Sequence, residues 1–417
     1  MTGLLFVFLS ATLISQSFMD AMSVVIILYM LALRFSKKTQ KTQFQALHSR
    51  HSFLFEIGFI ILWLATVAIG LKDSAHFAKN LWEWKWILNL YFMYWFLNHY
   101  LQQHSGLNQP RVLDVGFWQP LYWILLACFG YGAISYASGI DLFKQMPLTH
   151  GQRFAGPFDD PMNFAHIYGM YTVFLAPFVL DFLKTGAQQK KHARDWRAHA
   201  LASVAFACTA VSVYLSLTRG AWIGLFTGVV VIFFVYNWRW GLSLFVAGCL
   251  AAMVMYSAST TFKTRVDQAL NPSQSYDSER YNLWRSNWEM FKDHPVFGVG
   301  HGDYKEFLPT YFEKLDIPAD HFQSHAHNQY LHFLSNTGLI GFIFYMTFIL
   351  ALMVWTHQGY RRSRNPVLIG ALGAQVAFHM GSLTECNFER AKVRLVYLFF
   401  CALALAVMAQ ERKSSTP

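Results

Sequence analysis

The stretch SHAHNQYLHFLSNTGLIGFIFYMTFILALMVW, residues 324–355, passes from polar and histidine-bearing to strongly apolar without interruption. An apolar run of this length can cross roughly 30 Å of hydrocarbon as a helix. The stretch therefore predicts a membrane span that begins near Asn328, with His325 and His327 at its entrance. The rest of the chain decides which side of the membrane that entrance faces.

Composition predicts the same class of protein. The 417 residues are 54% hydrophobic and 13% charged, whereas soluble domains carry roughly 25% charged residues. We expect an all-α polytopic membrane protein with about 12 transmembrane helices. The first apolar run lacks the basic start and cleavage site of a signal peptide, so we expect it to be retained. The predicted spans are 3–18, 20–35, 52–71, 86–102, 116–138, 163–184, 199–216, 220–237, 239–258, 328–356, 367–384 and 393–410.

Basic clusters orient these spans. RFSKKTQKTQFQALHSRH, KTGAQQKKHARDWRAH and HQGYRRSRNP follow the second, sixth and tenth spans, so all three lie on one side. The positive-inside rule makes that side cytoplasmic, and it accounts for the net charge of +10 without nucleic acid. Both termini are then cytoplasmic, and the loops after spans five, seven, nine and eleven face outward. Trp82, Trp84 and Trp86 predict an outer aromatic belt.

The chain divides into residues 1–258 with spans 1–9, a large outward loop at 259–327, and residues 328–417 with spans 10–12, all one integral unit. A loop this long exceeds what a connection needs, so we expect it to be partly helical and functional. The scattered cysteines argue against a disulfide framework or a metal cluster and predict small core residues. They are Cys128, Cys208, Cys249, Cys386 and Cys401.

Two outward turns carry a lone arginine. Arg153 lies in THGQRFAGPFDDPMNFAH, residues 149–166, where an interfacial arginine snorkelling to headgroups is as good an interpretation as a binding residue. Arg219 lies in SLTRGAWIG, residues 216–224, a turn of a few residues between two apolar helices. Arginine near the membrane plane is costly and usually has an anionic partner. No acidic residue is close to Arg219 in sequence, which favours a functional role.

The large loop holds SERYNLWRSNWEMF, residues 278–291. At 100° per residue one face collects Arg280, Trp284, Trp288 and Phe291, with Tyr281 at its edge. An arginine within an aromatic stripe predicts burial against the body or a position in a cavity. The alternative is a cation–π stack of Arg280 on Trp284. Arg285 falls outside the stripe and is expected to be solvated or to face headgroups.

The entrance of the tenth span has several interpretations. His325 and His327 are two residues apart and cannot share a helical face, so we expect only one to point into a pocket. Asn328 fits an N-cap as well as a ligand role. Metal binding with His321 and His332 is the alternative, but the spacing matches no standard zinc pattern. FGVGHGDY, residues 297–304, follows His-Pro and not a strand, so its glycines predict a turn and not a nucleotide site.

These residue types indicate one chemistry. Arginine offers a planar fork that matches phosphate geometry. ATP is absent outside the cytoplasm, so the donor must be activated beforehand, as a lipid diphosphate sugar is. Arginines would neutralise the leaving diphosphate, and a neutral histidine could remove the proton of an attacking hydroxyl.

The set GQRFAG, SLTRGAW, SERYNLW, HPVFGVGHGDY and SHAHNQYLHFLSNTGLIG resembles the O-antigen ligase family, part of the wider group of O-antigen ligases and polymerases, over residues 150–390. The resemblance implies a metal-independent, inverting glycosyltransferase of the bacterial inner membrane with a periplasmic active site and no cofactor. It implies transfer of O-antigen polysaccharide from undecaprenyl pyrophosphate to the outer-core sugar of lipid A–core, completing lipopolysaccharide.

Carried over by position, the resemblance makes His327 the base and Arg219 and Arg280 the essential arginines. The implied substrate-binding residues are Arg153, His325, Asn328, Trp284 and Glu385, the last of which could orient an arginine. The family often has adjacent Pro-Asn after its GxRFxG turn. Here Met162 separates Pro161 from Asn163, which leaves the role of Asn163 open.

Three rival functions remain. An O-antigen polymerase uses similar donors with a growing chain as acceptor. Protein O-oligosaccharyltransferases usually carry a large C-terminal extension, whereas this sequence ends shortly after its last span, which favours the ligase. A transporter for the same lipids would be expected to show repeated halves and broken helices, and the sequence has no internal repeat.

Overall fold

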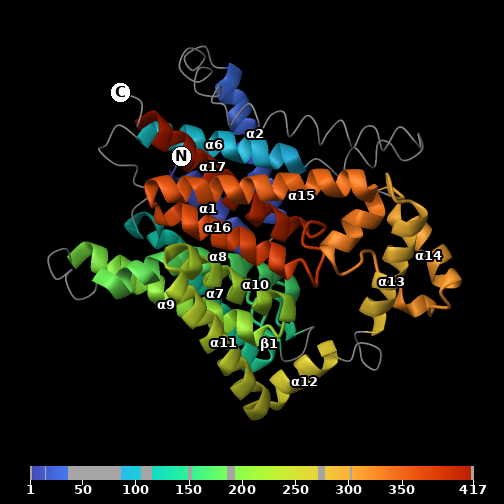
Figure 1. The fold of residues 1–417 in the computed structure, drawn as a ribbon. Helices are drawn as coiled ribbons and strands as arrows, with labels where there is room; N and C mark the ends of the chain where they lie inside the picture. The colour runs from blue at the N-terminus through green and yellow to red at the C-terminus, as the bar shows by residue number, and fades with distance from the viewer. Residues whose placement is uncertain are drawn as a thin grey trace.

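The computed structural model describes residues 2–14, 16–35, 86–104, 115–148, 153–185, 193–270, 278–300 and 303–414. Apart from a two-residue antiparallel pairing of β1 (Ile140–Asp141) with β2 (Met146–Pro147), its regular elements are helices (Figure 1). The predicted all-α class is confirmed. Helices occupy every predicted span except the third, 52–71, which lies outside the described residues, as do Trp82 and Trp84. Trp86 begins a helix.

Seven of the described helices are long and apolar enough to cross a membrane, and three shorter apolar helices accompany them. The protein is therefore a multi-pass membrane protein. The helices of the bundle are α1 (Thr2–Ile14), α2 (Gln16–Phe35), α6 (Trp86–His104), α7 (Gln119–Ser138, after the 3-10 turn Val115–Trp118), α8 (Pro161–Thr185), α9 (Ala193–Leu215), α10 (Arg219–Tyr236), α11 (Trp238–Ala258), α15 (Gln329–Ser363), α16 (Pro366–Gly381) and α17 (Ala391–Ser414).

The centre of the bundle is α16, which is buried along nearly its whole length and contacts α8, α10, α15 and α17. Its approach to α10 is close because α10 carries Gly220, Gly224 and Gly228 at four-residue spacing. A Cβ at Gly224 would lie 2.4 Å from the carbonyl oxygen of Ala377, so only glycine fits there. Small residues let membrane helices pack backbone to backbone. This packing draws the Arg219 turn toward the end of α16.

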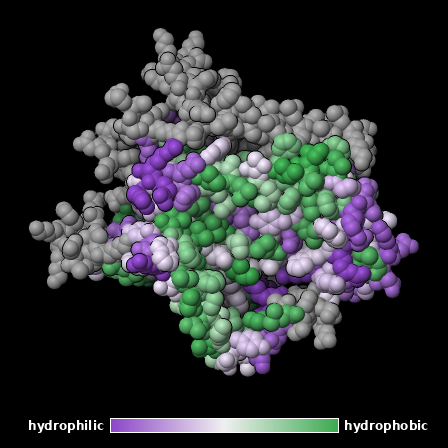
Figure 2. Space-filling view, in the orientation of Figure 1, coloured by the Kyte–Doolittle hydropathy of each residue, from purple (hydrophilic) through white to green (hydrophobic). Residues whose placement is uncertain are grey.

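The large loop between α11 and α15 is partly helical, as predicted. It contains α12 (Thr260–Leu270), α13 (Ser278–Asp293), α14 (Tyr304–Lys314) and the 3-10 turn Ala319–His321. Figure 2 shows hydrophilic residues over α13 and α14 and hydrophobic residues over much of α10, α11 and α15. The loop also has a small core of its own, formed by Leu283, Met290, Tyr304, Leu308, Tyr311, Phe312 and Ile317.

The helix α15 is interrupted, although its sequence predicted one continuous span. Gly338 has φ 63° and ψ −170°, outside helical geometry. The segment 295–300 supplies hydrogen bonds at the break: the N–H of Val299 donates to Ser335 O, and the N–H of Leu339 donates to Pro295 O. Gly298 has φ 69°, and a Cβ there would lie 2.3 Å from the backbone of Asn336. The predicted glycine turn is therefore confirmed, and it braces the broken helix.

Candidate active site

Three parts of the chain meet at one buried carboxylate: the helix α13, the start of α15 and the connection between α16 and α17. Glu385 lies between α16 and α17, and its side chain is 2% exposed. Its Oε1 accepts a hydrogen bond from Arg280 Nη2 on α13 at 2.8 Å. Its Oε2 accepts from His327 Nδ1 at 3.1 Å and from Arg390 Nη2 at 3.2 Å. Glu385 therefore joins the large loop, the start of α15 and the start of α17.

The charges around Glu385 keep it ionised. Burial alone would raise the pKa of its carboxyl group, because a buried charge is poorly solvated. The hydrogen bond and the electrostatic interaction with His327, together with the positive charges of Arg280 and Arg390, outweigh burial and hold this pKa well below its ordinary value. A permanent carboxylate thus stands at the centre of the site.

His327 is held in a defined orientation. A carboxylate can only accept, so the hydrogen bond to Glu385 assigns the proton of His327 to Nδ1 and leaves the Nε2 lone pair available. The backbone of His327 has φ 50°, in the left-handed region. Such strain persists where neighbours fix the chain on both sides. Here Trp284 Nε1 donates to Ala326 O at 3.0 Å, and the Asn328 side chain accepts from the N–H groups of Tyr330 and Leu331.

Asn328 therefore caps α15, as one of its two interpretations predicted. The turn that precedes it also brings His325 back onto His327. Their ring centroids are 4.4 Å apart, so the two rings lie side by side. The expectation that only one histidine points into a pocket stays a prediction. That expectation used helical spacing, whereas positive φ at His327 folds the chain back.

His325 is an unusual neighbour for His327. Its Nδ1 lies 3.0 Å from Ser324 Oγ, and its buried Nε2 has no hydrogen-bond partner among the described residues. Burial, and then the nearby charge of His327, lower the pKa of His325 to about 4. Its imidazole is therefore neutral at physiological pH.

Arg390 is the main residue that the sequence did not reveal. Besides Glu385 it contacts the start of α8, where Nη1 donates to Asp160 Oδ2 at 2.7 Å and to Asn163 Oδ1 at 3.2 Å. Its side chain is 14% exposed. These bonds give Asn163 a role, which is to hold Arg390. The available signal was an arginine in the same outward connection as Glu385, since charges at the end of a membrane span usually have partners.

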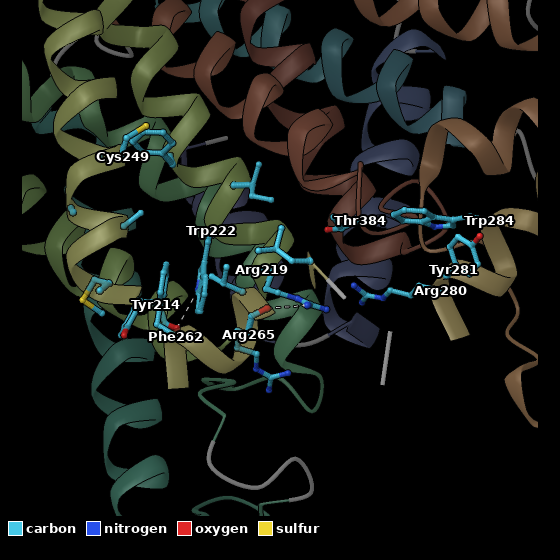
Figure 3. A pocket seen from close by; sticks show the side chains of 18 residues that line it. Tyr214, Arg219, Trp222, Cys249, Phe262, Arg265, Arg280, Tyr281, Trp284 and Thr384 are labelled. Atoms are coloured by element: carbon cyan, nitrogen blue, oxygen red, sulfur yellow. Dashed lines mark hydrogen bonds between the residues drawn. The ribbon is translucent and has the colours of Figure 1, made fainter. Parts of the chain in front are cut away.

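A cavity of about 720 Å³ lies beside this network, and Arg219, Arg280 and Arg265 line it. Figure 3 shows the guanidinium groups of Arg219 and Arg280 pointing toward each other across it, with Thr384 close by. Arg219 Nη1 donates to Arg265 O at 3.2 Å. The described lining contains no Asp or Glu. Two guanidinium groups that face each other in a wall without a described acidic residue favour an anion over a cation.

The other side of the cavity is apolar. Trp222 stacks on Phe262 with ring centroids 5.6 Å apart, and small residues of α11 make room beside α10. Much of α11 itself is exposed, and Gly241 is its one buried residue. This side of the cavity is lined by Ile223, Phe226, Gly248, Cys249, Ala251, Ala252 and Met255. Cys249 therefore lines a cavity, whereas Cys128, Cys386 and Cys401 are buried and all five cysteines are free.

The structure places the other predicted residues as follows. Arg153 donates to Ser216 O at 2.9 Å and to Thr218 Oγ1 at 3.0 Å, so it fixes the turn before Arg219. Arg280 and Trp284 line the cavity as the aromatic stripe predicted. The stripe is not uniformly buried, because Trp288 is 49% exposed and α13 instead buries Leu283, Ser286, Asn287 and Met290. Arg285 is exposed, as expected.

One group of residues has the composition of a metal site. One donor atom each from His325, His327 and Glu385 lies within 4.8 Å of the other two. Both oxygens of Glu385 already accept hydrogen bonds, and a metal ion there would stand beside the guanidinium groups of Arg280 and Arg390. That environment disfavours a cation. The predicted alternative, a site with all four histidines, is not assembled, because His321 contacts Asn282 and His332 contacts Asn336.

Comparison with known proteins finds one family and one relative. Residues 204–346 match the family model described as O-antigen ligase, a range that includes Arg219, Arg280 and His327. The chain is also 22% identical over 245 residues to the teichuronic acid biosynthesis protein TuaE of Bacillus subtilis (strain 168). That similarity covers 54% of this chain and 49% of TuaE, so the chain spans about half the length of this curated relative.

Proposed function

Because the chain belongs to the O-antigen ligase and polymerase superfamily, we propose that it is an O-antigen ligase. It transfers O-antigen polysaccharide from undecaprenyl pyrophosphate to the outer-core sugar of lipid A–core. The reaction is an inverting glycosyl transfer that needs no metal ion. The site faces the periplasm, since the basic clusters after the second, sixth and tenth predicted spans lie at the opposite ends of the spans.

The cavity suits the donor. Its apolar side between α10 and α11 accommodates a polyprenyl chain, and its arginines accommodate the diphosphate. Arg219 and Arg280 approach from two different elements, so two guanidinium groups can neutralise the charge that develops on the leaving group. Arg153 supports them by fixing the turn that carries Arg219.

His327 performs the proton transfer. Its Nε2 takes the proton of the acceptor hydroxyl while that oxygen bonds to the anomeric carbon of the donor sugar. The bond from that carbon to the diphosphate oxygen breaks on the opposite face, which inverts the configuration. Glu385 holds the Nδ1 proton and stabilises the imidazolium that forms.

The observation that carries this proposal is the double use of Glu385. One oxygen contacts Arg280, which lines the cavity, and the other contacts His327. A base and an anion-binding arginine held by one carboxylate are the two groups that a displacement of diphosphate by a hydroxyl requires.

Similarity to a teichuronic acid biosynthesis protein supports a second candidate, a polymerase for lipid-linked polysaccharide. The donor site and the base would be the same in a polymerase. The acceptor would be the growing lipid-linked chain instead of lipid A–core.

A transfer assay separates these candidates. Purified full-length protein is given undecaprenyl-pyrophosphate-linked O-antigen with either lipid A–core or a second lipid-linked chain, each with and without EDTA. We expect transfer only to lipid A–core, with EDTA having no effect. Transfer only to the lipid-linked chain would identify a polymerase, and loss of transfer in EDTA would contradict the metal-independent mechanism. Absence of transfer to both acceptors would contradict the assigned enzyme class.

A further inference from the structure

We propose that Glu385 is a positioning residue that couples donor binding to the base. Its Oε1 competes with the donor diphosphate for Arg280, while its Oε2 holds His327 throughout the reaction. The proposal rests on the proposed function and assigns to Glu385 a task beyond orienting an imidazole.

Arg280 has access to two anionic partners. Its side chain is 26% exposed, it lines the cavity, and it already donates to Glu385 at 2.8 Å. A guanidinium carries five N–H donors in a fixed fork, so it can move between two anions or bridge them. Hydrogen bonds between two charged groups are among the strongest that proteins make. The internal carboxylate therefore weakens the grip of Arg280 on a diphosphate.

The other oxygen does not share this competition. Oε2 keeps both His327 and Arg390, and Arg390 is anchored independently by Asp160 and Asn163. Arg390 is not among the described residues that line the cavity. When a diphosphate draws Arg280 away, the carboxylate stays in place and loses one of its positive neighbours. The negative charge beside His327 is then less neutralised, which favours the imidazolium that forms as the proton is taken.

The remaining charged groups around His327 do not duplicate this link. His325 is neutral and packs against it at a tilt from the same turn. Asp160 reaches the site only through Arg390, and Glu389 lies 3.9 Å from His332. His166 of α8 lies beside Asn387. Among the described groups that face His327, Glu385 is the one that also bonds to Arg280, a residue of the cavity wall.

Coupling of this kind has a signature that a structural role lacks. Glu385→Gln removes the charge that competes for Arg280, so the diphosphate should bind about 3- to 10-fold more tightly. The same substitution takes away the acceptor that orients and stabilises His327, so turnover should fall by about 10²-fold or more. A substitution that merely loosens the site would weaken both.

The test uses purified full-length protein in detergent. Binding of undecaprenyl diphosphate, with undecaprenyl monophosphate as reference, is measured by quenching of tryptophan fluorescence. Transfer is measured in parallel to give kcat and KM. The variants are Glu385→Gln, Glu385→Asp, Arg280→Ala and the double variant Arg280→Ala/Glu385→Gln. Glu389→Gln, an identical change four residues further along, is the matched control and should match wild type in both measurements.

We expect Glu385→Gln to lower the Kd for the diphosphate and also to lower kcat. In the Arg280→Ala background the same change should leave the Kd unaltered, because the competing partner is gone. Glu385→Asp keeps the charge but shortens its reach to Arg280, so it should bind more tightly than wild type and keep part of the turnover. Should Glu385→Gln not fold, the aspartate variant carries the test.

Weaker binding by both Glu385→Gln and Glu385→Asp would overturn the coupling. An equal gain in affinity with and without Arg280 would overturn it as well. These results differ from failure of the proposed function. In that case wild-type protein itself would bind the diphosphate no better than the monophosphate.

Discussion

Basic side chains lie near both ends of α15, but in opposite settings. At its end, Arg361 and Arg362 are exposed, and Arg364 closes the helix with φ 56° and its N–H on Tyr360 O. At its beginning, His327 is strained, hydrogen-bonded to a buried glutamate and followed directly by the Asn328 cap.

This contrast teaches what an arginine does in each place. The exposed arginines at the end of α15 lie in one of the basic clusters from which the orientation was predicted. Arg280 and Arg390 meet at one carboxylate near the beginning, and Arg280 also borders a cavity that has no acidic residue in its described wall. Burial and a shared partner distinguish a site from a solvated cluster.

Apart from loss of His327 itself, the largest predicted effect is on the cavity arginines. Removing either Arg219 or Arg280 takes away a cation that stabilises the leaving diphosphate, so transfer should fall by about 10²–10³-fold for Arg219→Ala and for Arg280→Ala. Arg361→Ala, near the end of α15, should keep a transfer rate within about twofold of wild type. An equal loss of transfer in Arg361→Ala and in the two cavity variants would show that positive charge in general, and not this cavity, supports transfer.

Arg390 should matter for stability. Arg390→Met removes the partner of Asp160 and one of the partners of Glu385, which should lower the free energy of unfolding by about 2–4 kcal/mol. Arg362→Met is the control, with an expected change below about 0.5 kcal/mol at an exposed site. The measurement is thermal unfolding of both proteins in the same detergent. A stable Arg390→Met protein would contradict the cross-linking role.

Part of the site could be predicted from sequence, because the predicted orientation of the spans and the types of residue in their loops indicate which residues form it. Arg219, Arg280 and His327 are polar residues in connections that are predicted to face outward between apolar helices. The contact of Arg390 with Asp160 joins residues 230 positions apart, and no local pattern marks it. The packing of His325 against His327 depends on the positive φ of His327, which composition does not encode.

The same holds for the fold. The apolar runs predicted twelve spans, and the eleven within the described residues are helical, because hydrophobic length is a local property. The break at Gly338 was not predicted, because the apolar pattern continues through it. The break depends on hydrogen bonds from residues 295–300, and the sequence around Gly338 does not show which segment will supply them.

A smaller effect concerns the packing that brings α10 to α16. Gly224→Ala places a methyl group against Ala377 O and should destabilise the protein by about 1–3 kcal/mol. Gly169→Ala, on α8, is the matched control, because a Cβ there meets nothing within 4 Å. The control should be neutral or gain up to about 1 kcal/mol. Thermal unfolding midpoints of the two variants decide between these outcomes, and equal midpoints would argue against the close α10–α16 contact.

The smallest effect is on the pH dependence of stability. The folded-state pKa of His325 is about 4, below the ordinary value of 6.5. As pH falls from 7 to 5 the unfolded chain gains a proton here and the folded protein does not, so folding loses about 1–2 kcal/mol. His325→Asn should lose this part of the dependence, whereas His357→Asn should keep it. Unfolding midpoints at pH 5 and pH 7 measure the difference, and parallel curves for all three proteins would contradict burial of His325.

The most direct measurement is the transfer rate of His327→Ala beside His357→Ala, which changes a histidine near the other end of α15. Both proteins are purified, shown to bind undecaprenyl diphosphate, and assayed in EDTA with lipid-linked O-antigen and lipid A–core. If His327 is the base, its loss should slow transfer by about 10²–10⁴-fold, while His357→Ala keeps the wild-type rate. A His327→Ala protein that binds donor and transfers at the wild-type rate would show that this histidine is not the base.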